Sequence, residues 1–393
     1  MNRETLADGC DHIESLKEFD ALLREKRKLR VKLGLDPTTS DLHLGHAVVL
    51  HKLQQFVEGG HHVTLIIGDF TGRIGDPSGR NEMRPPLSED QIQTNMATYA
   101  DQAGKILDME RVSIRYNSEW LAKLSLADMI RLLSQTTVAR MLDRNDFSQR
   151  YRSNEPIALH EFLYPIAQAY DSIAINADVE LGGNDQLFNL LMGRQYQAQA
   201  GQREQVCMTL PLLEGLDGQK KMSKTSGNYV GVAEDARSQF GKLMRMPDEL
   251  IPRYARLAAF RSEADSLQLG AALGGGSAHP MDEKKKIAEE IVTRYHGAAE
   301  AKRAREYFEQ TVQRRELPTG DVPQVSVGSA RRVSDVLVAA GLAESKRAAE
   351  RLILGGGVKV DGVVVTDPRA PWMQTVPVML SVGARRFVRV LPN

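Results

Sequence analysis

Two histidines near the start of the chain are the first candidates for chemistry. In Asp41-Leu42-His43-Leu44-Gly45-His46, the imidazoles are three residues apart, so they share one side of a helix that begins here. Backbone N–H groups and the positive end of the helix dipole lie beside them, and Gly45 lets a ligand approach the backbone. This pattern favours a polyphosphate. A metal pair would require H-E-x-x-H, which is absent. Ordinary histidines at a helix start remain the alternative.

A lysine-rich run is the second candidate. The segment 218–228 holds Lys220, Lys221 and Lys224 among small or flexible residues, with Met222 as its only hydrophobic anchor. A mobile basic loop can close over phosphates and then release the product. The alternative is a cluster of solvated surface lysines without a ligand.

The elements around the histidines predict how they are positioned. A short strand, 31–35, is followed by the polar turn 36–41 and by a helix in which Val49, Leu50, Leu53 and Val57 recur with a 3.6-residue period. Gly59-Gly60 ends this helix, and the β-branched strand 63–67 follows. Strand, turn, helix and strand form a βαβ unit, which predicts a parallel sheet with its ligand site at the carboxyl edge.

The remaining chain predicts further parts. A helix is expected at 14–28, a long loop at 72–79, and polar helices at 88–107 and 119–150, which behave as an insertion before the motif-rich stretch 160–187. The segment 231–312 is helical, and 315–329, with its prolines and glycines, is typical of a linker. The tail then predicts a helix ending at Gly341, a helix capped by Ser345, and a hairpin that turns at Asp361-Gly362.

Composition and charge exclude several classes of protein. The 393 residues carry 51 basic and 51 acidic side chains, but ten basic and five acidic residues fall in 331–393, so the tail carries +5 and the rest −5. Cys10 and Cys207 form no C-x-x-C pair, which excludes a disulfide scaffold and a thiolate zinc site. No apolar run approaches the ~20 residues of a membrane span, and no signal peptide is evident. We expect a soluble, cytoplasmic protein.

Taken together, the motifs resemble those of a known family. His-x-Gly-His followed some 180 residues later by Lys-Met-Ser-Lys resembles the HIGH and KMSKS signatures of class I aminoacyl-tRNA synthetases. Within that class, the chain is similar to the tyrosyl-tRNA synthetases of bacterial type. The similar segments are Gly34-Leu35-Asp36-Pro37-Thr38, Thr71 to Gly79, Tyr164-x-x-x-Gln168-Ala169-Tyr170-Asp171, and Gly182-Gly183-Asn184-Asp185-Gln186. The tail resembles a small RNA-binding module of the same bacterial enzymes.

The resemblance implies a tyrosine–tRNA ligase that forms tyrosyl-adenylate from L-tyrosine and ATP and transfers tyrosine to the 3′-terminal ribose of tRNA(Tyr). It implies these catalytic residues: His43, His46, Lys221, Lys224 and Thr225. It implies these tyrosine-binding residues: Lys32, Asp36, Asp76, Tyr164, Gln168, Asp171 as acceptor of the phenolic hydroxyl, and Gln186. The ATP-binding set is Gly34, Thr38, His43, Gly45, His46, Gly183, Asp185, Lys221, Met222 and Lys224. The tRNA-binding set is Arg331, Arg332, Lys346, Arg347 and Arg351.

Two positions depart from the family pattern. Lys32 stands where many members have a tyrosine that also contacts the phenolic hydroxyl, so its ammonium either pairs with Asp171 or points away. Leu187 stands where many members carry tryptophan. A separate bacterial subgroup would account for both departures.

The resemblance also implies the architecture and the partners. We expect an α/β fold: a Rossmann-like parallel-sheet catalytic domain at 1–229 with a helical insertion at about 118–160, an α-helical domain at 230–314, a linker at 315–330, and a small α+β RNA-binding domain at 331–393. A homodimer joined through the insertion is expected, with Mg²⁺ accompanying ATP and no dedicated protein metal site.

Three rival functions differ in their sequence features. A tryptophanyl-tRNA synthetase shares both signatures but normally lacks the tail, and Asp171 suits a phenol better than an indole. A nucleotidyltransferase of the same superfold would be shorter and would need no tRNA-binding tail. An RNA-binding paralogue with a decayed site would not be expected to retain His43, His46, Lys221 and Lys224.

Overall fold

The computed structural model describes residues 3–37, 41–78, 88–314, 322–328, 330–383 and 386–391. The chain divides into two compact units, and each has its own sheet. The first unit contains 1–235 and 242–291, and the second contains 236–241 and 292–393. No helix of the described residues is long and apolar enough to cross a membrane.

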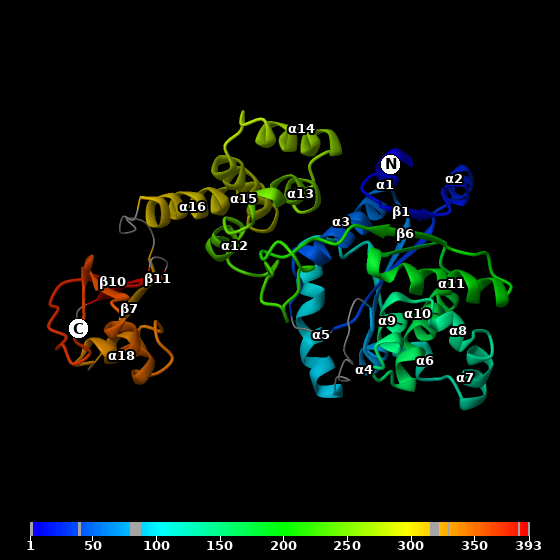
Figure 1. Ribbon diagram of the computed structural model, residues 1–393, viewed down its shortest axis with the longest axis horizontal. Helices are drawn as coiled ribbons and strands as arrows, with labels where there is room; N and C mark the ends of the chain where they lie inside the picture. The colour runs from blue at the N-terminus through cyan, green and yellow to red at the C-terminus, as the bar shows by residue number, and fades with distance from the viewer. Residues whose placement is uncertain are drawn as a thin grey trace. The chain divides into compact units, whose positions relative to one another are not determined.

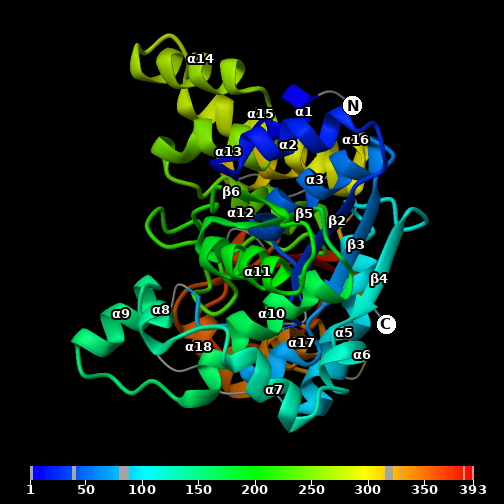
Figure 2. The same ribbon diagram turned by 90° about the vertical axis from the view of Figure 1, so that its right-hand side faces the viewer.

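The first unit is built on a six-stranded sheet in the order β1-β6-β5-β2-β3-β4 (Figures 1 and 2). Five strands are parallel, and only the short edge strand β1 runs antiparallel, against β6. The strands are β1 (His12–Glu14), β2 (Arg30–Leu35), β3 (His62–Ile67), β4 (Val112–Tyr116), β5 (Val179–Gly183) and β6 (Val206–Leu210). The predicted α/β class with a parallel sheet is confirmed. β1 was not predicted, because three residues are too few to show a period.

The predicted βαβ unit is confirmed as β2, α3 (Leu44–Glu58) and β3. Val31 and Leu33 are buried in β2, and α3 buries the apolar side formed by Leu50, Leu53 and Val57. The chain leaves β2 toward β3 on one side and leaves β5 toward β6 on the other, so the order reverses between β2 and β5. Ligands bind at such switch points in open parallel sheets, outside the carboxyl ends of the strands.

Helices surround this sheet. The predicted helices at 14–28 and 88–107 are present as α2, capped by Ser15, and α5, capped by Ser88. Besides α3, the helices of this part are α1 (Arg3–Ala7), α2 (Leu16–Arg24), α4 (Thr71–Ile74), α5 (Glu89–Ala103), α10 (Leu163–Ala174), η2 (Asn184–Gln186) and α11 (Leu187–Gln199). The insertion consists of α6 (Ser118–Leu121), α7 (Leu126–Leu133), α8 (Val138–Met141), α9 (Asn145–Arg152) and η1 (Leu159–Phe162).

The insertion packs on α10 and α11 through an apolar cluster of its own. Leu132 and Met141 are buried there against Ile166 of α10 and Met192 of α11. The hydroxyl of Tyr196 donates a 2.8 Å hydrogen bond to the carbonyl oxygen of Leu132, which pairs one of the few polar groups in this cluster. The insertion is therefore part of the framework that holds α10.

The segment expected to be helical at 231–312 is helical. Its elements are α12 (Ala236–Leu243), η3 (Asp248–Leu250), α13 (Ile251–Leu257), α14 (Glu263–Gly274), α15 (Pro280–His296), α16 (Ala298–Phe308) and η4 (Glu309–Gln313). The division into compact units passes through α12 and α15.

The tail forms a small α+β fold, as predicted. Its sheet has the order β7-β11-β10-β8-β9, with strands β7 (Gln324–Ser326), β8 (Val358–Val360), β9 (Val363–Val364), β10 (Val378–Val382) and β11 (Arg386–Leu391). Its helices are α17 (Val333–Ala339) and α18 (Lys346–Leu354), and Ser345 caps α18 by accepting a hydrogen bond from the N–H of Ala348. Asp361 and Gly362 both have positive φ, as a type I′ turn requires.

The predicted linker is shorter than the sequence indicated. β7 lies inside the range 315–330 and pairs in parallel with β11, from Gln324 opposite Arg389 to Ser326 opposite Leu391. Val322 and Val327, on either side of this strand, are buried. A three-residue strand among prolines and glycines shows no alternation long enough to be recognised, so 322–328 belongs to the tail and not to a linker.

Candidate active site

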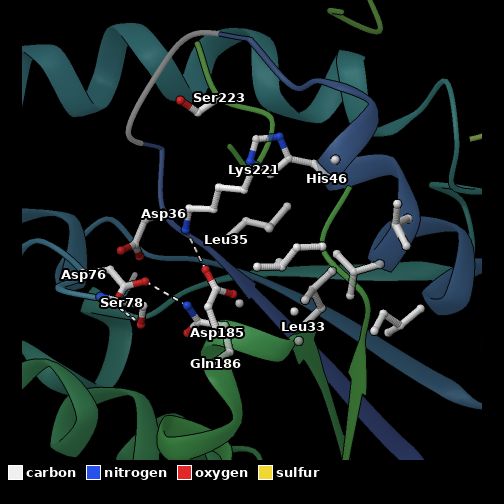
Figure 3. Close-up of a pocket in the computed structure, with 18 of the residues that line it drawn as sticks. Leu33, Leu35, Asp36, His46, Asp76, Ser78, Asp185, Gln186, Lys221 and Ser223 are labelled. Carbon is white, nitrogen blue, oxygen red and sulfur yellow. Dashed lines mark hydrogen bonds and ion pairs between the residues drawn. The ribbon is translucent and has the colours of Figure 1, made fainter. Parts of the chain in front are cut away.

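A cavity of about 910 Å³ opens at the carboxyl ends of β2 and β5, where the strand order reverses (Figure 3). It brings together most of the residues predicted from the sequence. The predicted residues that line it are Gly34, Asp36, His43, Gly45, His46, Asp76, Tyr164, Gln168, Asp171, Gly183, Asp185, Gln186, Lys221, Met222, Lys224 and Thr225. Segments separated by almost two hundred residues thus meet in one cavity.

Thr38 and Lys32 are the predicted active-site residues that this set does not include. Thr38 lies outside the described residues. Lys32 is buried below the cavity, where its Nζ atom lies 2.9 Å from Oε1 of Glu180. Of the two possibilities that the sequence left for this ammonium, the structure therefore places it on Glu180 and not on Asp171.

The two histidines stand together at the start of α3. Their ring centroids are 3.9 Å apart, and the backbone N–H of His43 donates a 3.2 Å hydrogen bond to Nδ1 of His46. A Cβ atom on Gly45 would lie only 3.0 Å from the His43 ring, so a side chain there would push the ring out of this position. Burial and the charge of Lys221 lower the pKa of His46 to about 4. Burial also holds the pKa of His43 well below its usual value, with further contributions from His46 and Lys221.

Both imidazoles are therefore neutral at pH 7. Because Nδ1 of His46 accepts a hydrogen bond, its proton resides on Nε2. A neutral imidazole in this state offers an N–H donor to an anionic ligand. It does so without the cost of burying an additional charge.

The basic loop carries its lysines into the cavity while Met222 anchors it. Met222 is buried, and its backbone N–H donates a 2.8 Å hydrogen bond to the carbonyl oxygen of Leu213. Lys221 reaches across to Asp185, with 2.7 Å between Nζ and Oδ2 (Figure 3). Lys224 pairs with Asp41, and this hydrogen bond raises the pKa of the lysine. Both cations are thus held at the cavity, each by a carboxylate.

Polar groups at the end of β2 form one side of the cavity. Oδ1 of Asp36 accepts a 2.7 Å hydrogen bond from the hydroxyl of Thr71, and Oδ2 accepts one of 2.8 Å from the hydroxyl of Tyr164. Asp36 is thus fixed by residues from two different helices, α4 and α10. Tyr164, Gln168 and Asp171 lie on one face of α10 because they are four and three residues apart.

Asp76 is held by a network that sequence reasoning found only in part. Its Oδ1 accepts hydrogen bonds from the N–H and the hydroxyl of Ser78, at 2.9 and 2.6 Å, and its Oδ2 accepts one of 2.9 Å from Gln186. Buried Arg144 lies 3.4 Å from Oδ1 and also donates to Ser78 and Asn189. Burial alone would raise the pKa of Asp76, but the Arg144 charge and these hydrogen bonds bring it below its ordinary value.

Arg144 could not have been identified from the sequence. It belongs to the insertion and lies 68 residues from Asp76 in the sequence. The surrounding residues are polar and indicate a solvated helix. No local motif marks it as a partner of a carboxylate in the loop after β3.

Asp171 lies at the inner end of the cavity. The indole Nε1 of Trp120 donates to Oδ1 at 2.7 Å, and the amide of Asn117 donates to Oδ2 at 3.4 Å. Burial raises the pKa of Asp171 to about 7, although Lys32, Trp120 and Asn117 act in the opposite direction. A buried carboxylate with room for another donor suits a ligand that ends in a hydroxyl group.

The acidic side chains near the cavity bear on metal binding. Among the described residues there is no group of three or more His, Cys, Asp or Glu side chains that could hold one. Mg²⁺ is commonly bound through one or two carboxylates together with substrate phosphates. Asp185 lines this cavity and pairs with Lys221, and Asp41 pairs with the lining residue Lys224.

The five basic residues predicted to contact RNA are all exposed. Arg331 and Arg332 precede α17, while Lys346, Arg347 and Arg351 lie on the first turns of α18. Arg347 and Arg351 are four residues apart and share one face. Lys346 also pairs with Asp335 at 2.8 Å.

Comparisons with known proteins agree with this site. The model of the class I tRNA synthetases (W and Y) matches residues 24–313, and the S4 domain model matches residues 331–371. A tyrosine–tRNA ligase of Thermotoga maritima is 48% identical over 380 residues, covering 96% of this chain and 94% of the relative. One from Oleidesulfovibrio alaskensis is 47% identical over 390 residues, covering 99% and 98%.

Solved structures share the fold. The tyrosyl-tRNA synthetase of Aeropyrum pernix has a TM-score of 0.63 at 21% identity, covering 78% of this chain and 97% of that one. The enzyme of Archaeoglobus fulgidus, solved with L-tyrosine, has a TM-score of 0.63 at 22% identity, covering 77% and 98%. On the family model and the relatives together, the chain belongs to the tyrosine–tRNA ligases of the class I tRNA synthetase family.

Proposed function

We propose that the chain activates L-tyrosine with ATP and then esterifies the tyrosine to the 3′-terminal ribose of tRNA(Tyr). The observation that supports this best is that two chemically different sets of side chains line one cavity. Asp171 and other α10 side chains form one set, and the histidines with Lys221 and Lys224 form the other. The first set suits an amino acid with a terminal hydroxyl, and the second suits phosphates.

In the first proposed step, a carboxylate oxygen of tyrosine attacks the α-phosphorus of ATP. An O–P bond forms, and the bond to pyrophosphate breaks. Negative charge then develops on the phosphates, where oriented donors lower the barrier without a covalent enzyme intermediate. His43 and His46 would donate N–H groups there, and Lys221, Lys224 and Thr225 would hold the departing pyrophosphate. The lysines must first leave Asp185 and Asp41, which pair with them here.

Each tyrosine group would have its own partner. The phenolic hydroxyl would donate to Asp171, and Asp76, Tyr164 and Gln168 would hold the α-ammonium. Asp36, at the start of the turn that precedes α3, accepts a hydrogen bond from the hydroxyl of Tyr164 and would act near the ammonium, while Gln186 would orient the carboxylate. Asp185 and Gly183 would bind the ribose side of ATP. Gly34, Gly45 and Met222 also line the cavity and would contact ATP there.

In the second proposed step, a ribose hydroxyl of the tRNA attacks the tyrosyl carbonyl carbon, loses its proton, and releases AMP. The tail would hold the tRNA through Arg331, Arg332, Lys346, Arg347 and Arg351, because exposed basic side chains neutralise phosphates. Because the cytoplasm supplies ATP and tRNA, we also propose that the protein is cytoplasmic. Mg²⁺ would enter with ATP.

The proposal includes a homodimer joined through the insertion. Large apolar side chains are exposed there, among them Leu126, Ile130 and Val138. Leu126 and Ile130 lie one turn apart on α7, so they form a continuous apolar strip. We retain the four-part division of the chain as a proposal, with the linker now confined to the residues before Val322.

Pyrophosphate exchange into ATP, measured with each proteinogenic amino acid, tests the function directly. We expect exchange with tyrosine alone, followed by charging of a tRNA(Tyr) transcript. Exchange that depends on tryptophan, or none with any amino acid, would contradict the proposal.

A further inference from the structure

A buried ion pair lies beneath the cavity. Lys32 of β2 and Glu180 of β5 are directly paired neighbours in the parallel sheet, and each side chain is only 1% exposed. Taking two charges out of water costs free energy that their mutual attraction often does not recover. A pair of apolar residues would fill this place at least as well, so stability alone does not account for the pair.

Glu180 is the centre of a larger polar cluster. It accepts hydrogen bonds from Gln168 at 3.1 Å, from Ser172 at 3.2 Å, and from Gln205. The neighbouring helix α11 passes this cluster at Gly193. A Cβ atom there would clash with Gln205 and lie only 2.8 Å from the hydroxyl of Ser172. The surrounding elements thus leave room for this set of polar groups.

The cluster determines how Gln168 presents itself to the cavity. Because an ionised Glu180 can only accept, it takes the NH₂ group of Gln168 and leaves the carbonyl oxygen Oε1 for another partner. This Oε1 is buried and has no hydrogen-bond partner among the described residues. An acceptor oriented in this way suits a cationic ammonium group and would be lost if the amide turned around.

Lys32 connects the same pair to Asp171. Its Nζ donates a 3.3 Å hydrogen bond to the backbone carbonyl of Gln168, three residues before Asp171 on α10. Both charges act on the pKa of Asp171: Lys32 lowers it, and Glu180 raises it more weakly. The other neighbours of the carboxyl group are the donors Trp120 and Asn117.

We propose that Lys32 and Glu180 are positioning residues for tyrosine: Glu180 orients the Gln168 carbonyl toward the α-ammonium, and Lys32 places a cation behind the acceptor of the phenolic hydroxyl. The inference rests on the proposed function. It assigns to Lys32 a role that differs from direct contact with the phenol. The resemblance places a tyrosine that contacts the phenol at this position. Lys32 instead acts through Gln168 and Asp171.

Three variants test this inference. In Glu180→Gln, an acceptor-only carboxylate is replaced by an amide that can also donate, so Gln168 is no longer fixed in one orientation. The KM for tyrosine should then rise about tenfold or more while the KM for ATP stays the same. In Lys32→Met, Asp171 loses its cation and keeps the Glu180 charge. The acid limb of kcat/KM for tyrosine should then move upward by about one pH unit or more.

The double variant Lys32→Met with Glu180→Gln separates positioning from folding. It leaves no unpaired buried charge, so its melting temperature should recover relative to either single variant. Its KM for tyrosine should nevertheless stay raised, because Gln168 is no longer oriented and Asp171 has no cation nearby. Asp178→Asn is the matched control. Asp178 is a buried carboxylate just before β5, near Glu180 in the sequence, and it pairs with Arg27 and Arg30 instead of Lys32.

The control should lower stability without raising the KM for tyrosine. If the double variant recovers both its melting temperature and a wild-type KM for tyrosine, the pair is structural and the inference is wrong. If the wild-type chain shows no tyrosine-dependent exchange, the proposed function itself fails. The two failures are therefore distinguishable.

Discussion

The indole Nε1 of Trp120 donates a 2.7 Å hydrogen bond to Oδ1 of Asp171, which joins the insertion to the inner end of the cavity. Trp120 lies on α6, the first helix of the insertion, and Asp171 lies on α10. Asn117, just before α6, is the second donor to this carboxyl group. Each carboxylate oxygen has two lone pairs, so Asp171 retains capacity to accept a phenolic hydroxyl.

We predict that Asp171→Asn reduces the preference for tyrosine over phenylalanine by about tenfold or more. With the carboxylate present, phenylalanine leaves a buried acceptor without its donor, and an amide in its place weakens that penalty. The measurement is the ratio of kcat/KM for the two amino acids in pyrophosphate exchange, with the KM for ATP as the internal reference. Unchanged selectivity would mean that another group reads the hydroxyl, and a Lys32→Tyr variant would then test that side of the pocket.

The ionisation of Asp171 predicts a specific pH dependence. Because burial raises its pKa to about 7, the carboxyl group becomes protonated as the pH falls below that value, and the ionised acceptor is lost. We expect kcat/KM for tyrosine to fall by about tenfold per pH unit on this acid limb. The histidines should add no such limb to kcat/KM for ATP, since their pKa values lie well below 6.5. In Asp171→Asn the limb should vanish, and a limb that persists would assign it to another group.

The sequence predicted some parts of this site better than others. The βαβ unit could be predicted because β-branched and apolar residues follow clear periods, and its motifs had to meet where parallel strands end. The partner of Lys32 could not, because Glu180 is 148 residues away and only the register of β2 with β5 brings them together. Arg144 and Trp120 could not be predicted for the same reason. Each contacts a carboxylate that is far away in the sequence, and neither lies in a recognisable pattern.

We expect His46→Ala and Lys224→Ala to slow adenylate formation by about 10²–10³ while tyrosine binding is retained. Each removes one oriented donor from the phosphate end, and neither contacts Asp171 or Gln168. Single-turnover formation of tyrosyl-adenylate measures the rate, and calorimetry measures tyrosine binding. Lys28→Ala is the control, because Lys28 is exposed and precedes the amino end of β2, whereas the cavity lies at the carboxyl end of that strand. Wild-type rates in the two active-site variants would contradict their assigned role.

The apolar strip on α7 predicts an effect on assembly. Leu126 and Ile130 are 78% and 59% exposed, an unfavourable arrangement unless another surface covers them. Replacing both with aspartate should shift the chain from dimer to monomer in sedimentation velocity. The hydrophobic cluster that contains Leu132 and Met141 should remain intact, so the circular dichroism spectrum should not change. A variant that sediments as the wild type does would exclude this face of α7 from the interface.

The last prediction concerns the tail, which carries +5 over 331–393 and has a core of its own around Val336, Leu337 and Ile353. Because β7 pairs with β11, a clean truncation must end before Val322, and we choose Arg314. The truncated chain loses the contact of Tyr307 with Phe387 but keeps those of Phe308 with Phe240 and of Tyr307 with Arg237.

Tyrosine-dependent pyrophosphate exchange should survive this truncation nearly unchanged, because every residue that lines the cavity precedes residue 229. Transfer to tRNA should fall steeply, most visibly at low salt, where neutralisation of phosphates contributes most. In the full chain, Arg347→Ala with Arg351→Ala should weaken tRNA binding and flatten its dependence on salt, as expected when about two phosphate contacts are lost. If the truncated chain charges tRNA as well as the full chain does, the tail is not the clamp, and the RNA-binding surface must be sought in the helical segment 231–312.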